Sequence, residues 1–484
     1  MLCQSPFTHL QPLQDCKQIY QFLDFCRKRS IAENQPKIAS VALEIEAMQS
    51  TSSCSVIDPL IVLNHLHRSN QLHFYLENRD QGRSIAAIGS AVALTVNGKE
   101  RFKQAQNFIQ TQLDQILASY PVDFPWTTPR FFCSFTFFDQ QTHCDSPFPG
   151  ATVFLPRWQI IRWQEHHGAI VNLPIQSDSN LQQLTQTIWQ EFRSICQAQY
   201  DVFQLPQGIT PLLNQWEIID HNSFQPAVTS VLKSIETHQF DKVVLAHAID
   251  VISQLPFQWG RSLNDLRQLH SGCTVFSIGN GNGQSFIGAS PERLLSIQNR
   301  RFLTDALAGS APRGRTAIED DTLGDQLYRS DKERHEHQVV VDFITQRLVN
   351  VGLTPRFTAT PTLRKLANIQ HLHTPIQAIL PPSLHPLALV AELHPTPAVA
   401  GRPREVACEQ ICQYEGFERS LYAAPLGWID AQGNAEFVVG IRSALIDGHR
   451  ARLYAGAGIV AGSNPDRELA EIRLKLQALL RALV

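Results

Sequence analysis

Residues 273–298 read CTVFSIGNGNGQSFIGASPERLLSIQ, and their pattern favours one fold class over another. It holds three short segments rich in apolar residues, at 273–280, 285–290 and 293–298, each of strand length. The GNGNG at 279–283 joins the first two segments with residues that tolerate positive φ, so it predicts a hairpin turn. A nucleotide-binding glycine loop would instead lead from a strand into a helix. The stretch therefore predicts antiparallel strands.

The same mixture extends in both directions along the chain, because strand-like segments and helical patterns are interspersed. Antiparallel strands with interspersed helices predict an α+β protein rather than a doubly wound parallel sheet. Further strand-like segments lie at 38–47, 84–96, 130–138, 151–161, 166–175, 242–252, 426–430, 435–445 and 451–456. Helical patterns lie at 14–28, 99–117, 178–198, 226–237, 331–349, 402–413 and 465–483.

The length of the chain bounds its organisation. At about 150 residues per domain, 484 residues suggest about three domains or one unusually large two-sheet domain. The best boundary candidate is the polar, proline-containing stretch at 204–225.

Charge and composition exclude several classes of protein. With 41 Lys+Arg against 44 Asp+Glu, the net charge of -3 gives no overall attraction to nucleic acid. No run of 18 or more apolar residues predicts a membrane span, and the N-terminus lacks the features of a signal peptide. We therefore expect a soluble cytoplasmic protein, with a plastid location left open. The ten scattered cysteines favour reduced thiols over a disulfide framework or a structural zinc site.

Two helices carry acids beside an apolar face. In the last helix, Glu468, Glu471 and Lys475 form one stripe, which predicts either an exposed Glu471–Lys475 pair or acids that flank a site. In DKERHEHQVVVDFI (331–344), Glu336 shares a stripe with Val340 and therefore needs a partner for its carboxylate. Carboxylates without Cys or His ligands suit Mg²⁺, which usually takes further ligands from an anionic substrate.

The small-residue run LYAGAGIVAGS (453–463) lies immediately before the acidic helix. Its alternating Ala and Gly predict either a close approach of a carboxylate or phosphate to the backbone or a tightly packed strand. Arg442 and Tyr454, on neighbouring strand segments, would add a charge and a hydroxyl to an anion site. Considered one at a time, Arg442 is expected to be a surface arginine and Tyr454 a half-buried tyrosine.

Ordered blocks along the second half resemble the chorismate-binding enzyme family. The resemblance covers roughly residues 220–484, and the first half, 1–215, is similar to the isochorismate synthase branch through FYLENRDQGRSIAAIGSA. It implies one large two-sheet α/β sandwich of antiparallel strands with helices outside. The blocks are FDKVVLAHAIDV, FIGASPERLL, LTDALAGSAPRG, DKERHEHQVVVDFI, LANIQHLHTPI, LHPTPAVAG, PLGWID, FVVGIRSALI, YAGAGIVAGS and DRELAEIRLK.

Two positions indicate a branch of this family. Lys242 stands where water-using members carry Lys and ammonia-using members usually carry Gln, and Ala308 stands where aminodeoxychorismate synthases carry a nucleophilic Lys. The resemblance therefore implies an isochorismate synthase that acts on chorismate without an amidotransferase subunit. The oligomeric state is left open, with a monomer favoured. Its product would feed menaquinone, phylloquinone or salicylate formation. Salicylate synthase, which further eliminates pyruvate, and a non-catalytic chorismate-binding subunit are the alternatives.

The resemblance also implies roles for individual residues. Moving a hydroxyl from C4 to C2 of chorismate needs an acid for the leaving hydroxide and a base for the attacking water. Glu292 resembles the acid, which burial must keep protonated, and Lys242 resembles the base, which must be a neutral amine. His371 matches a site histidine, whereas we interpret His373 as a turn residue.

The remaining implied contacts are those of the metal and the two carboxylates of chorismate. Mg²⁺ would be held by Glu336 and Glu471, assisted by Glu468, and would bind the ring carboxylate, to which Ser310 could also donate. The enolpyruvyl carboxylate would be held by Tyr454, Arg442, Lys475, Gly456 and Gly458.

Four positions depart from the family pattern. His247 stands in place of an Arg, and glycines are replaced by Ala400, Ser420 and Ala424. These changes narrow the backbone freedom near the site and predict reduced activity or an altered substrate fit, but none removes a proposed catalytic atom.

Overall fold

A computed structural model describes residues 3–4, 13–45, 57–119, 127–139, 146–198, 216–220, 223–366 and 369–483. The strands are β1 (Cys3–Gln4), β2 (Lys37–Glu44), β3 (Leu72–Asn78), β4 (Arg83–Ile88), β5 (Val92–Val96), β6 (Ile116–Ala118), β7 (Arg130–Phe135), β8 (Ala151–Leu155), β9 (Trp158–Trp163), β10 (His166–Ile175), β11 (Trp216–Asp220), β12 (Lys242–Ser253), β13 (Thr274–Asn280), β14 (Ser285–Ser290), β15 (Arg293–Gln298), β16 (Arg301–Pro312), β17 (Thr362–Lys365), β18 (Ile369–Ile379), β19 (Gly401–Arg402), β20 (Pro425–Asp430), β21 (Ala435–Val439), β22 (Ser443–Asp447) and β23 (Arg450–Val460). The helices are α1 (Cys16–Glu33), α2 (Pro59–Leu66), η1 (Arg79–Gln81), α3 (Arg101–Leu113), α4 (Leu181–Cys196), α5 (Phe224–Glu236), α6 (Trp259–Leu269), α7 (Ala317–Arg329), α8 (Asp331–Asn350), α9 (Pro386–Leu393), α10 (Arg404–Tyr414) and α11 (Pro465–Leu483).

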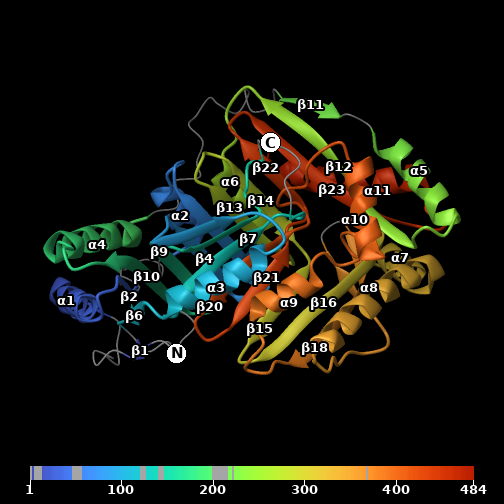
Figure 1. Ribbon diagram of the computed structural model, residues 1–484. Coiled ribbons are helices and arrows are strands. Elements are labelled where there is room, and N and C mark those ends of the chain that lie inside the picture. The colour runs from blue at the N-terminus through green and yellow to red at the C-terminus, as the bar shows by residue number, and fades with distance from the viewer. Residues whose placement is uncertain are drawn as a thin grey trace.

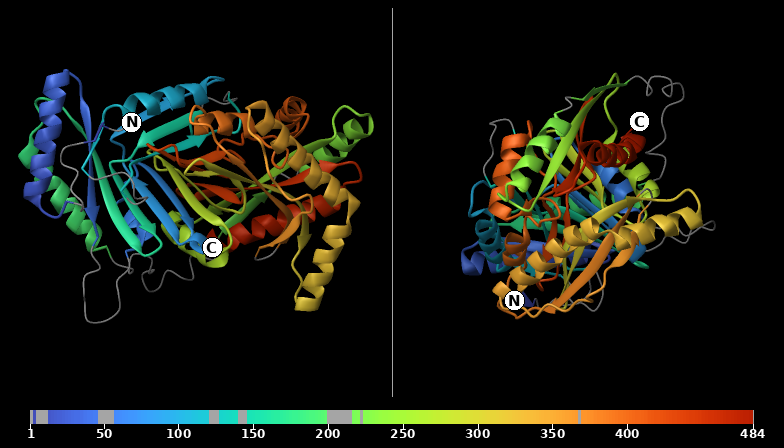
Figure 2. Two further views of the ribbon diagram at one scale, coloured as in Figure 1. Left: turned by 90° about the horizontal axis from the view of Figure 1, so that it is seen from below. Right: turned by 90° about the vertical axis from the view of Figure 1, so that its right-hand side faces the viewer.

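These strands form two large sheets, and the predicted α+β class and two-sheet architecture are confirmed. The 14-stranded sheet has the order β1-β6-β2-β10-β9-β4-β3-β13-β14-β22-β23-β12-β11, and β19 also pairs with β12. The 9-stranded sheet has the order β17-β18-β16-β15-β21-β20-β7-β8-β5. Strands from both halves of the chain enter both sheets (Figures 1 and 2).

The stretch at 273–298 forms the predicted hairpin and then changes sheet. β13 pairs with β14 in antiparallel register, and Gly281 and Gly283 in the turn have φ of 77° and 88°. Positive φ at these two positions explains why glycine serves there. The chain then passes through Pro291 and Glu292 and continues as β15 in the other sheet.

Three other changes of sheet contradict single strands predicted from the sequence. The segments 84–96, 151–161 and 435–445 are each two strands, because β4, β9 and β22 belong to one sheet and β5, β8 and β21 to the other. The breaks have local causes: Gly89 has φ of 62°, Pro156 has no backbone donor, and Arg442 has φ of 50°. Glu292 and Arg442 therefore both lie where the chain crosses between sheets.

The predicted helices are present, with ends shifted by a few residues. Ser330 begins α8 by accepting a hydrogen bond from the Glu333 amide, and Pro465 occupies the first turn of α11. Helix α8 packs on β16 and β18, whereas α11 packs on β23 of the other sheet. In Figure 1, α1 and α4 lie together at one end of the molecule and α5, α7 and α8 at the other. The predicted boundary at 204–225 lies mostly outside the described residues.

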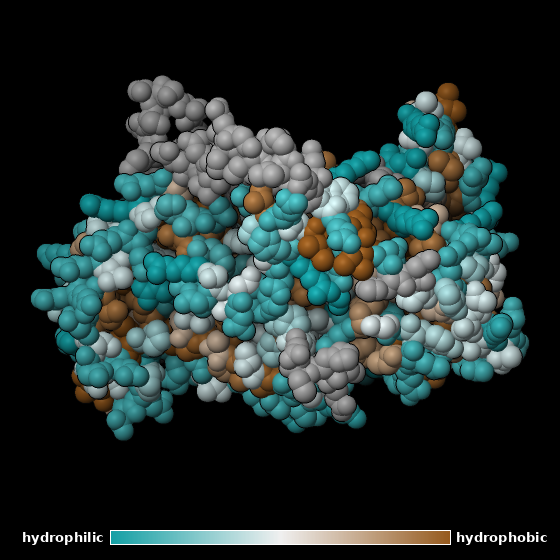
Figure 3. All heavy atoms as spheres, turned by 90° about the horizontal axis from the view of Figure 1, so that it is seen from above, coloured by the Kyte–Doolittle hydropathy of each residue, from teal (hydrophilic) through white to brown (hydrophobic). Residues whose placement is uncertain are grey.

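Apolar residues concentrate in the interior. The apolar stripe of α11 is buried at Leu469, Ile472, Leu476 and Leu479. The face shown in Figure 3 is mostly hydrophilic, with hydrophobic residues in separate patches. Among the described helices, none has an apolar stretch of the length and hydropathy that crossing a membrane requires. The cysteines described individually, Cys16, Cys26, Cys133, Cys196, Cys273, Cys408 and Cys412, are free thiols.

Candidate active site

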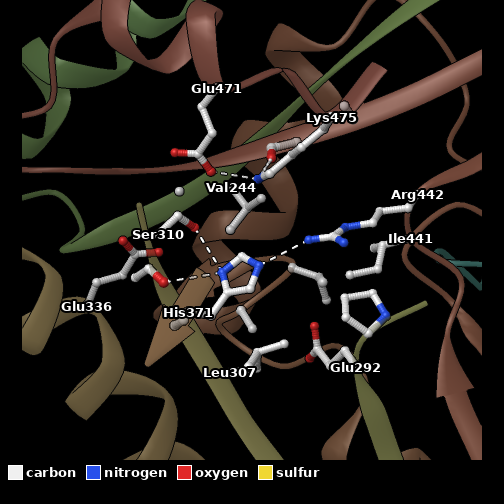
Figure 4. Close-up of a pocket in the computed structure, with 18 of the residues that line it drawn as sticks. Val244, Glu292, Leu307, Ser310, Glu336, His371, Ile441, Arg442, Glu471 and Lys475 are labelled. Atoms are coloured by element: carbon white, nitrogen blue, oxygen red, sulfur yellow. Dashed lines mark hydrogen bonds and ion pairs between the residues drawn. The ribbon is translucent and has the colours of Figure 1, made fainter. Parts of the chain in front are cut away.

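A pocket of about 700 Å³ lies between the sheets and is also lined by α8 and α11. Ten of the twelve site residues predicted from the sequence line it, namely Glu292, Ser310, Glu336, His371, Arg442, Tyr454, Gly456, Gly458, Glu471 and Lys475. Figure 4 shows Glu336 and Glu471 on one side of His371, and Glu292 and Arg442 on the other. The other two predicted residues lie next to the pocket, Lys242 beneath its wall and Glu468 in an adjoining cavity.

Lys242 is the first residue of β12, and its side chain is almost wholly buried. Its Nζ donates to Glu336 Oε1 over 2.8 Å. Gly458 on β23 makes room for this pair, because a Cβ there would meet Glu336 Oε1 and would lie 3.2 Å from Lys242 Cε. Gly458, which we predicted would let a ligand approach the backbone, therefore also leaves space for the contact between Lys242 and Glu336.

Glu292 is buried at the crossing from β14 to β15. Burial raises the pKa of its carboxyl to about 8, and the nearby Asp305 carboxylate acts in the same direction. Lys242 and Arg364 oppose this shift without cancelling it. Glu292 is therefore protonated at neutral pH, the state that a general acid needs.

His371 connects Arg442 to Ser310. Its Nε2 lies 3.1 Å from Arg442 Nη2, and its Nδ1 lies 3.0 Å from Ser310 Oγ and 3.2 Å from the Gly309 carbonyl oxygen. Arginine only donates hydrogen bonds, so Nε2 must accept, and Nδ1 carries the proton and donates to the Gly309 carbonyl. Burial and the positive charge of Arg442 lower the pKa of His371 well below its usual value. The imidazole is therefore neutral with a defined tautomer.

The pair Glu471–Lys475 forms as the spacing predicts, but it faces the pocket instead of lying on an exposed surface. Lys475 Nζ lies 2.6 Å from Glu471 Oε1 and donates to the Gly456 carbonyl over 2.7 Å. Burial disfavours ionisation of Glu471, but Lys475, together with Lys332 and Ser310, outweighs it and lowers the pKa of the carboxyl. The surface arginine and half-buried tyrosine expected for Arg442 and Tyr454 taken singly are wrong, since both side chains are buried.

Four carboxylates surround the boundary between the pocket and the adjoining cavity. Glu336 and Glu471 line the pocket, and Glu333, Glu468 and again Glu471 line the cavity. In the described part of the chain, no three His, Cys, Asp or Glu side chains form a group that could hold a metal ion. Lysines instead contact the three predicted ligands: Lys242 pairs with Glu336, Lys332 with Glu468 and Lys475 with Glu471.

The donor chemistry at this boundary nevertheless fits a hard cation. Burial raises the pKa of Glu333 and of Glu468, and in each case a neighbouring acid, Glu336 or Glu471, raises it further. Such mutual repulsion favours a positive charge among the four groups, and oxygen-only donors suit Mg²⁺. Glu333 was not predicted, although it lies one helical turn before Glu336 and could have been identified by that spacing.

Several other side chains differ from expectation or were missed. His373 is not a turn residue, because it lies in β18 with Nε2 3.0 Å from Asp305 Oδ1. Tyr422, which also lines the pocket, stacks on Tyr454 with ring centroids 5.2 Å apart. No motif in the sequence marked Tyr422 or Asp305 as part of the site.

The four residues that depart from the family pattern differ in their surroundings. His247 Nε2 lies 2.9 Å from Asp220 Oδ1, and Ala400 and Ala424 are fully buried. Ser420 has φ of 49°, a backbone conformation that favours glycine. Its substitution for glycine therefore places strain in the backbone close to the pocket residue Tyr422.

The chain is similar in sequence to known proteins. The chain is 42% identical over 266 residues to a salicylate biosynthesis isochorismate synthase of Pseudomonas aeruginosa. The aligned part covers 54% of this chain and 55% of that protein. It is 37% identical over 286 residues to isochorismate synthase MenF of Bacillus subtilis, covering 59% of this chain and 60% of that protein. The aligned part thus spans little more than half the length of each relative.

One solved structure extends the likeness over nearly the whole chain. The menaquinone-specific isochorismate synthase MenF of Escherichia coli superposes with a TM-score of 0.74 at 25% identity, covering 96% of this chain and 100% of that one. The family description "Chorismate binding enzyme" matches residues 28–484. The chain therefore belongs to the family of chorismate-binding enzymes.

Proposed function

We propose that the protein is an isochorismate synthase, which converts chorismate to isochorismate by adding water at C2 and releasing the hydroxyl from C4. The observation that carries the proposal is a buried carboxyl with a pKa of about 8, Glu292, in a pocket that is also lined by Glu336, the ion-pair partner of the buried amine of Lys242. An acid and a base of these types are what the reaction requires. The matching relatives bear the name isochorismate synthase.

Glu292 would act as the general acid. The C4 hydroxyl leaves poorly as hydroxide, so the proton held by Glu292 must be given to that oxygen as the C4–O bond breaks. The Asp305 carboxylate supports this role, because it favours the neutral form of Glu292.

Lys242 would act as the general base. To accept a proton from the attacking water, its Nζ must be neutral and must give up its ion pair with Glu336. Its branch-specific position and the alanine at 308 support water over ammonia or an enzyme amine as the nucleophile. For the same reason we expect no ammonia-supplying subunit.

The two carboxylates of chorismate would bind at different ends of the pocket. Arg442, Lys475, Tyr454 and the backbone at Gly456 and Gly458 would hold the enolpyruvyl carboxylate. The neutral His371 would orient Arg442 through its Nε2, while Ser310 would face the ring carboxylate. With these contacts, the substrate would lie between Glu292 and Lys242.

Mg²⁺ would be held by Glu336 and Glu471 with help from Glu468, and when bound it would neutralise the ring carboxylate. The crowding of acids in this region supports the assignment. All of these residues lie within 220–484, so we propose that this part of the chain carries the chemistry.

Product analysis tests the proposal. Purified protein is incubated with chorismate and Mg²⁺, and the products are separated and identified, with EDTA added to a parallel sample. Isochorismate as the main product, lost with EDTA, is the expected result. Salicylate and pyruvate as main products would overturn the proposal in favour of a salicylate synthase, and an absence of turnover would favour a non-catalytic chorismate-binding subunit.

A further inference from the structure

Lys332 is a cation beside the pocket to which the proposed reaction gives no role. It lies in the first turn of α8, and its Nζ is 3.1 Å from Glu468 Oε1 on α11 and 3.4 Å from Glu333 Oε1. About one third of its side chain is exposed, and it lines the adjoining cavity together with these two acids and Glu471. Lys332 therefore joins the acids of two helices that pack on different sheets.

The stability of α8 does not explain a lysine at this position. A positive charge in the first turn opposes the helix dipole, whereas Asp331 and Glu333 in the same turn have the favourable sign. The compensation comes from outside the helix, through the contact with Glu468 of α11. Lys332 is therefore better explained by its contacts with Glu333 and Glu468 than by any contribution to the stability of α8.

The three lysines that contact proposed metal ligands differ in what else they touch. Lys475 also donates to the Gly456 carbonyl at the pocket wall, and Lys242 is buried below that wall. Lys332 does not line the pocket, and its contacts above are to carboxylates alone. Because it is also partly exposed to the cavity, its ammonium can leave Glu468 for solvent by side-chain rotation.

We infer that Lys332 is a tethered counter-cation that holds Glu333 and Glu468 in the metal-free protein, competes with the divalent metal for them, and so sets metal affinity. This inference rests on the metal site of the proposed function. When a metal ion approaches, the ammonium and the ion compete for the oxygens of Glu468 and Glu333 and repel each other, so we expect the ion to displace the ammonium. Metal binding therefore includes the cost of displacing Lys332.

Calorimetric titration of the full chain with Mn²⁺ and with Mg²⁺, without chorismate, tests the inference. Lys332→Gln removes the competing charge and keeps a polar side chain, whereas Lys332→Arg keeps the charge. A partly exposed ion pair and one nearby positive charge together correspond to an affinity change of about three- to tenfold. Lys332→Gln should therefore bind either metal about three- to tenfold more tightly than the unaltered protein, and Lys332→Arg should not.

Two controls separate this role from others. Lys103→Gln removes the same charge from an exposed site on α3, where Lys103 lies 3.9 Å from Glu100, and should leave metal affinity unchanged. Thermal unfolding gives a second readout: Lys332→Gln should lower the midpoint without metal and should gain more stability than the unaltered protein when metal is added. A purely structural role would lower the midpoint equally with and without metal, and that result would overturn the inference.

The outcomes also distinguish the inference from the proposed function. If the unaltered protein binds metal and Lys332→Gln binds it equally or more weakly, the inference is wrong and the proposed metal site stands. If neither protein binds metal without chorismate, the inference is wrong, and if neither binds it in the presence of chorismate, the proposed metal site is wrong as well. Binding that appears or tightens only in Lys332→Gln supports the inference.

Discussion

Lys242 Nζ lies 2.8 Å from Glu336 Oε1, so the proposed base and a proposed metal ligand are bound to each other. The Lys242 side chain is almost wholly buried at 1% exposure, whereas Glu336, at 12%, also lines the pocket. In such a pair, removal of one partner leaves the other charge uncompensated. The pairing means that Lys242 can act as a base only after Glu336 has exchanged its lysine for another partner.

Replacement of Lys242 by Ala tests the base assignment. Turnover should fall by at least about 10²- to 10⁴-fold, the usual contribution of a general base, while metal-dependent chorismate binding remains largely intact. Product formation is measured by chromatography and binding by calorimetry. Lys103→Ala, at an exposed site on α3, is the matched control and should behave as the unaltered protein. Normal turnover of Lys242→Ala would show that another group activates the water.

The pH dependence of kcat/KM tests Glu292 as the acid. Because burial raises the pKa of its carboxyl to about 8, activity should be retained up to neutral pH and should decline as the pH rises through about 8. Glu292→Gln cannot give up a proton from a carboxyl and should lose about 10²- to 10⁴-fold in turnover at every pH.

Asp305→Asn tests the cause of this shift. The Asp305 carboxylate disfavours ionised Glu292, so its neutralisation should lower the pKa of Glu292 and move the alkaline decline to lower pH. His373, Arg293 and Arg364 hold Asp305 ionised, and Lys242 and Arg364 also face Glu292. A decline that stays in place in this variant would mean that a different group titrates.

Nuclear magnetic resonance of the imidazole nitrogens tests the state of His371. The arginine donor at Nε2 and the carbonyl acceptor at Nδ1 require the neutral ring with its proton on Nδ1. We expect this single form at neutral pH, because burial and Arg442 lower the pKa of the ring well below its usual value. A doubly protonated ring at neutral pH would contradict the arrangement.

Ser420→Gly should stabilise the protein. The serine has φ of 49° and its buried hydroxyl has no hydrogen-bond partner among the described residues, so glycine relieves both costs. We expect a gain of about 1 kcal/mol in the free energy of unfolding, measured by denaturant titration. Ser296→Gly, in the middle of β15, is the matched control and should instead lose about 0.5–1 kcal/mol. Equal losses in the two variants would exclude strain at Ser420.

Local periodicity was sufficient to predict two of the acids that helices bring to the site, although it missed Glu333. The three- and four-residue spacings placed Glu336 beside the apolar stripe of α8 and Glu471 beside that of α11, and both carboxylates line the pocket. The glycines at 281 and 283 likewise predicted the hairpin through their positive φ. These features depend only on residues that are close together in the sequence, so a local sequence pattern is enough to predict them.

Features that depend on long-range pairing were not predictable in this way. An alternating strand pattern does not say which sheet a strand joins, so the crossings that position Glu292 and Arg442 could not be seen. The contact of His373 with Asp305 joins residues 68 positions apart on β18 and β16. The lysine partners of the acids also depend on how α8 and α11 meet across two sheets, which no local spacing contains.

In the proposed reaction water adds at C2 while the C4 hydroxyl leaves, and oxygen labelling distinguishes this course from others. Chorismate is incubated with the protein and Mg²⁺ in water labelled with heavy oxygen, and the product is isolated and analysed by mass spectrometry and nuclear magnetic resonance. The account predicts isochorismate that carries a single heavy oxygen at C2 and none elsewhere. Isochorismate without the label, or labelled salicylate in its place, would contradict it.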